Sequence, residues 1–70
     1  MNIKCTNMKK FVESLGVITT PCTVWVGEEP NDGFFIRNED ANKAQQQKII
    51  THASLLGIEI GVSDKGATFC

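Results

Sequence analysis

The feature that most limits the possible folds of this chain is a pair of amphipathic segments, each of which ends in Leu-Gly. In the first, apolar side chains recur at i, i+3, i+4 and i+7, and they are Met8, Phe11, Val12 and Leu15. This spacing is typical of one face of an α-helix. Gly16 follows directly, where a helix commonly ends in a left-handed residue. The segment therefore predicts a helix with Thr6 or Asn7 as its N-cap.

The second segment predicts a longer helix over residues 41–56, closed by Gly57. Its apolar stripe consists of Ile49, Ala53 and Leu56, which lie at helical spacing. Residues 38–40 precede it with the sequence Asn-Glu-Asp. They are expected to cap the helix and to place negative charge at its N-terminus, where the helix dipole favours it.

Strand patterns fill the intervals around these helices. The expected strands cover residues 1–5, 17–26, 33–37, 58–62 and a short extra strand at 67–70. The order β-α-β-β-α-β predicts an α+β fold in the ferredoxin-like, split βαβ arrangement, with two helices on one face of a mainly antiparallel sheet. If the first five residues are not a strand, the order becomes αββαββ.

The two middle strands predict a hairpin whose five-residue loop lies between Gly27 and Gly33. In that register Trp25 lies opposite Phe35, with Arg37 on the same face. This face points away from the helices, so it would expose two large aromatic side chains to solvent. We expect the C-terminal strand, a partner, a second copy or a ligand to cover it.

Size and charge restrict the function. Seventy residues make one domain, residues 1–70, with no spare chain for a deep catalytic cleft. The net charge of −1 disfavours a strong electrostatic grip on duplex DNA. No apolar run approaches the ~18 residues that span a bilayer, and the first residues do not resemble a secretory signal. We expect a cytoplasmic protein that is not an enzyme and has no membrane partner.

The residues that could carry chemistry are spaced far apart. Cys5, Cys22, Cys70 and His52 have the right number for a tetrahedral zinc site, but they include no CxxC or HxxxH pair. The absence of CxxC also disfavours dithiol redox chemistry, and no nucleophile is linked to the single histidine. We therefore predict reduced thiols, no catalytic residue, no metal and no cofactor.

A ferredoxin-like sheet with aromatic side chains on its open face resembles the RNA-recognition motif in general plan. Phe35 would lie on the third strand, a stacking position in that family, and Trp25 on the second. Lys4 and Arg37 would contact phosphates. The sequence lacks the RNP1 pattern of the family and an aromatic residue on the first strand. The resemblance implies single-stranded nucleic-acid binding as an alternative function.

Acidic residues flank the aromatic pair in the sequence, and they are Glu28, Glu29, Asp32, Glu39 and Asp40. Aromatic anchors with a charged rim are common where one protein docks on another. We expect a small protein-interaction module, an accessory or inhibitor protein of a microbe or phage, that docks on a basic protein surface. Its binding residues would be Trp25, Phe35, Arg37 and these acids. A homodimeric structural protein is the other alternative.

Overall fold

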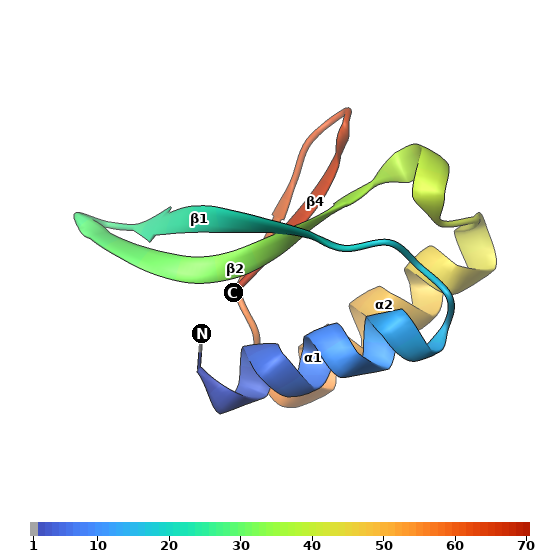
Figure 1. Cartoon of the computed structure of the whole chain (residues 1–70), viewed down its shortest axis with the longest axis horizontal. Coiled ribbons are helices and arrows are strands. Elements are labelled where there is room, and N and C mark those ends of the chain that lie inside the picture. Colours follow the sequence, from blue (N-terminus) through green and yellow to red (C-terminus); the bar gives the residue numbers. More distant parts are fainter. Residues whose placement is uncertain (1) are drawn as a thin grey trace.

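The computed structural model describes residues 2–70, in which two helices lie against one face of a four-stranded antiparallel sheet (Figure 1). The elements are α1 (Ile3–Ser14), β1 (Thr20–Val26), β2 (Glu29–Arg37), a 3₁₀ turn (Asn38–Asp40), α2 (Lys43–Leu56), β3 (Ile60–Val62) and β4 (Gly66–Phe69). The strand order in the sheet is β1-β2-β4-β3. A small α+β fold is confirmed, whereas the ferredoxin-like arrangement is not, because the described order is αββαββ.

The strand predicted over residues 1–5 is wrong where the structure describes it, since α1 already begins at Ile3. Met1 lies outside the described residues. The Asn2 side chain caps α1 by accepting a hydrogen bond of 2.8 Å from the Cys5 backbone N–H. The alternation of five residues was too short to distinguish a strand from a helix. Cys5 instead extends the helical stripe of Met8 and Val12 by one turn, and all three are buried.

The second helix begins later than predicted, at a capping box. The Asn42 side chain accepts from the Gln45 backbone N–H at 2.8 Å, and the Gln45 side chain accepts from the Asn42 backbone N–H at 3.0 Å. The predicted cap, residues 38–40, forms the 3₁₀ turn instead. The predicted stop is confirmed, because Gly57 closes α2 in the left-handed conformation with φ of 69°.

Replacing Asn42 by alanine is expected to lower the free energy of unfolding by about 1 kcal/mol, since it removes one half of the capping box. Urea unfolding followed by circular dichroism measures this change. Asn42→Asp serves as the control, because aspartate keeps the acceptor oxygen and should cost much less. Equal losses in the two variants would contradict the cap.

The β1–β2 hairpin is tighter than predicted. Val26 lies opposite Glu29, so the connection is the two-residue turn Gly27-Glu28, and the five-residue loop is wrong. Gly27 has φ of 64°, and Glu28 does not have a positive φ, because no described non-glycine residue does. A type II′ turn requires this combination, with a positive φ at its first central residue only. Pro30 had suggested a loop. It lies in the half of β2 that β4 does not reach, where a missing N–H breaks no ladder bond.

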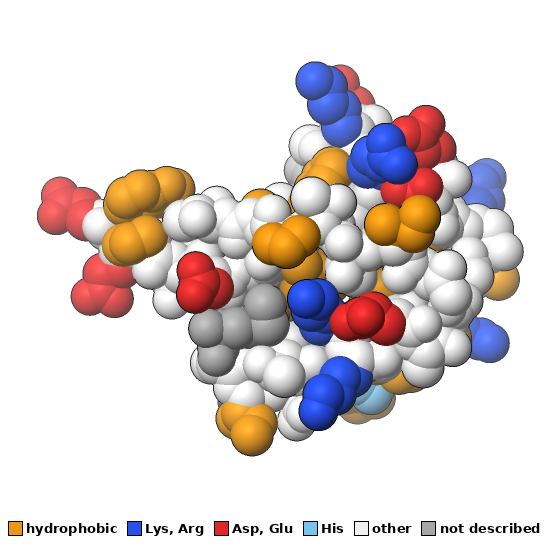
Figure 2. Space-filling model, in the orientation of Figure 1, with side chains coloured by type: hydrophobic (Ala, Val, Ile, Leu, Met, Phe, Trp, Pro, Cys, Tyr) orange, Lys and Arg blue, Asp and Glu red, His pale blue; other side chains and the backbone are white. Residues whose placement is uncertain are grey.

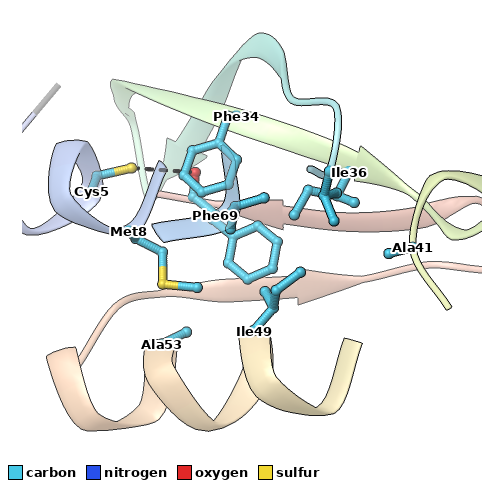
Figure 3. Packing of buried hydrophobic residues seen from close by; sticks show 10 residues of the cluster. Cys5, Met8, Phe34, Ile36, Ala41, Ile49, Ala53 and Phe69 are labelled. Atoms are coloured by element: carbon cyan, nitrogen blue, oxygen red, sulfur yellow. Dashed lines mark hydrogen bonds between the residues drawn. The ribbon is translucent and has the colours of Figure 1, made fainter. Parts of the chain in front are cut away.

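The core lies between the sheet and the helices (Figure 3). Phe34 and Phe69, neighbours on β2 and β4, stack with their ring centroids 5.0 Å apart. The helices cover this pair, with Met8 on α1 and both Ile49 and Ala53 on α2 pointing toward it. No polar or charged residue among residues 2–70 is buried, so apolar packing is the main source of stability.

Candidate interaction surface

The outer half of the β1–β2 hairpin, residues 23–32, projects beyond the helical layer (Figure 1). We refer to these residues as the arm. β4 pairs with β2 only from Phe34 to Arg37, so the arm consists of two strands without a third. An isolated two-stranded hairpin is at best marginally stable in water. The arm therefore relies on the rest of the fold to hold its shape.

Exposed apolar and acidic side chains share the arm. Trp25 is 66% exposed and Val26 is 46% exposed, and Glu28 and Glu29 are exposed at the turn. Figure 2 shows this arrangement, with hydrophobic side chains close to the tip and acidic side chains at its end. Asp32 adds a third carboxylate, and residues 23–32 contain no lysine or arginine. The arm thus combines an apolar anchor with negative charge only.

The backbone of β1 is open on its outer side, because β1 is an edge of the sheet. The two-residue turn makes Val26 and Glu29 a hydrogen-bonded pair, and such pairs alternate along an antiparallel ladder. Thr23 and Trp25 therefore direct their N–H and C=O groups away from β2. Pro21 has the same orientation without an N–H, which limits strand pairing at the inner end of this edge.

Phe35 does not join Trp25, and the predicted Trp–Phe pair is wrong. Trp25 lies opposite Pro30, whereas Phe35 lies opposite Thr20 on the other face of the hairpin. The Phe35 ring covers Gly66, since a Cβ atom placed on Gly66 would lie 2.9 Å from Phe35 Cζ. This half-buried ring packs across β2 and β4. It is part of the packing of the sheet.

The remaining predicted residues lie at the other end of β2. Arg37 Nε contacts Asp40 Oδ2 at 2.8 Å, and its Nη1 atom contacts Glu39 Oε1 at 3.1 Å. The hydrogen bond to Asp40 and the nearby carboxylates raise the pKa of Arg37. Glu29 and Arg37 are eight positions apart on β2, a distance of about 26 Å along an extended strand. Glu39 and Asp40 are therefore paired with a cation and do not surround Trp25.

Lys4 is separated from Phe35, one of the two aromatic side chains that the nucleic-acid alternative requires. It lies on α1, in the helical layer, while Phe35 faces away from that layer because Phe34 faces it. The structure brings together Trp25 and the acids of the arm. It separates them from Phe35, Arg37 and the acids of the 3₁₀ turn.

The three cysteines, which are distant in sequence, lie close enough to affect one another. Burial is the main cause that raises the pKa of Cys5, Cys22 and Cys70, and proximity to Cys70 raises the pKa of the other two further. All three are free thiols. Within residues 2–70 no group of His, Cys, Asp and Glu side chains is arranged to hold a metal ion. His52 stacks on Phe11, with ring centroids 4.0 Å apart.

Stability is expected to fall at alkaline pH because of these thiols. Their pKa values are raised in the folded state, so the unfolded chain loses its thiol protons first as the pH rises. Their contribution is complete below the thiol pKa of the unfolded chain and is lost progressively above it. Urea unfolding between pH 7 and pH 10 measures the slope. Cys5→Ala should reduce that slope, and an unchanged slope would contradict this origin.

Comparisons with known proteins assign no family to this arrangement. No protein-family model matches the chain, and neither a curated protein nor a solved structure matches it. In the part of the chain that the structure describes, no helix has the length and apolar character needed to cross a bilayer. The functional argument therefore depends on the geometry of the arm.

Proposed function

We propose that this chain is a non-enzymatic protein-interaction module whose arm docks on a basic surface of another protein. The observation that carries the proposal is the 66% exposure of Trp25 on a two-stranded projection that bears only acidic charges. A tryptophan exposed in this way is costly in water and is among the residues most enriched at binding hot spots.

The acids of the arm give the proposal its charge preference. Glu28 and Glu29 lie at the turn, so they would meet a partner first and steer its approach. The same charges oppose nucleic-acid binding at Trp25, because phosphates would approach carboxylates with no nearby cation on the arm. An acidic arm on a basic protein surface would also obstruct nucleic-acid binding by that partner. This action is in keeping with an accessory or inhibitor protein of a microbe or phage.

A charge-reversal experiment tests this proposal. The tagged chain, immobilised, captures partners from a nuclease-treated native extract, and mass spectrometry identifies them. Glu28→Lys with Glu29→Lys is expected to abolish capture of a basic protein. The matched control is Glu13→Lys with Asp64→Lys, which changes the net charge equally at exposed positions outside the arm. Capture should survive in this control.

Three outcomes would contradict the proposal: capture that the arm variant retains, capture that both variants lose equally, and capture that depends on nucleic acid. The last outcome would favour the alternative of single-strand binding.

A homodimer is the second candidate, and one observation favours it. β1 is an edge strand of seven residues without a charged side chain, and such edges readily pair with another strand. Sedimentation at several concentrations distinguishes the two functions. A monomer that captures a basic protein supports the module, whereas a dimer that Thr23→Pro dissociates supports edge pairing.

A further inference from the structure

The outer edge of β1 lacks the features that usually keep an exposed strand edge from pairing. Such features are charged side chains, prolines, bulges and short length. β1 has seven residues, none of them charged, and its one proline, Pro21, lies at the inner end. Its pairing with β2 runs without a bulge. The opposite edge of the sheet, β3, has only three residues. Within residues 2–70, β1 is therefore the edge that can accept another strand.

The backbone groups that an added strand would use belong to Thr23 and Trp25. Both residues direct their N–H and C=O groups away from β2, and both are exposed. An added strand would give the arm the third strand that β4 does not provide (Figure 1). It would also place a side chain opposite Trp25, at the Cβ separation of about 4.5–5.5 Å that is typical of cross-strand pairs. Strand addition would therefore cover the indole.

The charges of β2 behind this edge determine which strand fits. The β2 residues that lie opposite positions 23–26 are, in turn, Asp32, Asn31, Pro30 and Glu29. The two ends of this row are acidic and its two middle positions are neutral. An added strand would lie two strand spacings from β2, about 9.5 Å, which is within the Debye length of about 10 Å at 0.1 M salt. A segment with basic ends and an apolar middle therefore complements the row in either chain direction.

We propose that β1 binds the basic partner by strand addition, and that the partner supplies an extended segment with the pattern basic-apolar-apolar-basic. This inference rests on the proposed docking of the arm and specifies the form of the partner at that site. Hydrogen bonds to the backbone of Thr23 and Trp25 hold the segment, while its side chains provide specificity. Its apolar side chains cover the indole and its cations face the acids of β2.

A second copy of the chain fits this edge less well than a basic segment does. β1 contains no cation, and the arm bears only acidic charges. Pairing of two β1 strands would bring two acidic arms together with no cation between them. Such a juxtaposition of like charges opposes association, whereas a basic segment removes it.

The test adds the peptide acetyl-Thr-Lys-Val-Val-Lys-Thr-amide to the chain and follows amide hydrogen exchange by NMR. In the free chain the N–H groups of Thr23 and Trp25 should exchange rapidly. The N–H of Val24 should exchange more slowly, because Val24 forms a hydrogen-bonded pair with Asn31. Peptide at about ten times its dissociation constant should slow exchange at Thr23 and Trp25 roughly tenfold, since only the unbound fraction exchanges.

Two isomers of the peptide with methylated backbone nitrogens are the matched controls. One is methylated on the first lysine and the second valine, and the other on the first valine and the second lysine. An added strand directs alternate N–H groups toward β1, so one isomer should bind and the other should not. The acidic analogue acetyl-Thr-Glu-Val-Val-Glu-Thr-amide should not bind.

Exchange at Thr23 and Trp25 that millimolar peptide leaves unchanged would overturn the proposal, as would equal binding of the two isomers or of the acidic analogue. Protection of the same amides without peptide, increasing with protein concentration, would assign the edge to a second copy instead. Failure of strand addition is distinguishable from failure of docking. A captured partner that changes the emission of Trp25 while both amides stay exposed would support docking and exclude strand addition.

Discussion

Replacing Phe34 by alanine is expected to unfold most of the protein at 25 °C. Phe34 is fully buried and stacks on Phe69, beneath both helices. Truncating a buried phenylalanine costs about 3–5 kcal/mol, because the transfer energy is lost and a cavity remains. A core in a chain of this size supplies only about 3–5 kcal/mol in total. The loss therefore approaches the whole stability, and circular dichroism should show a largely unfolded spectrum.

Trp25→Ala is the matched control for this prediction, because it truncates a larger aromatic side chain at an exposed position. Its melting temperature should stay within a few degrees of the parent value, since surface substitutions usually change stability by about 0.5 kcal/mol or less. A folded Phe34→Ala protein would contradict the described core. A Trp25→Ala protein that unfolds would show that the indole is part of that core.

The same Trp25 variant is expected to weaken binding of the captured partner by about 30-fold or more. Anchoring tryptophans at interface centres contribute at least about 2 kcal/mol by alanine substitution, which corresponds to this factor. Titration calorimetry with the purified partner measures the change. The effect should appear mainly in the dissociation rate, because the acids that steer association remain in place.

Leu55→Ser provides the control for the binding experiment. Leu55 is 80% exposed on α2, so it is as accessible as Trp25 but lies outside the arm. Its substitution should leave affinity within about twofold. Equal losses from the two variants would assign binding to general surface hydrophobicity and would contradict an anchor at Trp25.

Local glycine signals made the ends of both helices predictable from the sequence. Gly16 and Gly57 follow the apolar stripes directly, and both have positive φ. The starts were harder, because several residues in each case have side chains able to cap. Asn42 is the N-cap of α2 because its partner Gln45 completes a capping box. The N-x-x-Q pattern of this capping box was present in the sequence, and its two reciprocal hydrogen bonds are the physical reason why α2 begins there.

The hairpin register was not predictable from turn composition alone. Pro30 and Gly33 indicated a loop, yet both belong to β2. Pro30 is tolerated because β2 lacks a second neighbour there. Gly33 is required because the Phe69 carbonyl oxygen and Cys70 approach its backbone too closely for a side chain. Both reasons are tertiary, so no local pattern could supply them. Gly27-Glu28 was the one local signal for the tighter turn.

The register of the β1–β2 hairpin also determined which residues of the candidate surface could be predicted from the sequence. Trp25 and the acids at the turn are close in sequence, so their grouping on the arm does not depend on a long-range contact. Phe35 was assigned to the same face only through the wrong register. The approach of Cys70 to Gly33 depends on the pairing of β4 with β2, which the spacing of the cysteines does not reveal.

The emission of Trp25 tests the central claim, that the arm is the binding element, most directly. The chain contains one tryptophan, so its fluorescence reports on the arm alone. The free protein should emit as a solvent-exposed indole that acrylamide quenches readily. On addition of the captured basic partner, emission should shift to shorter wavelength and quenching should fall. Binding that leaves both the spectrum and the quenching unchanged would contradict the claim.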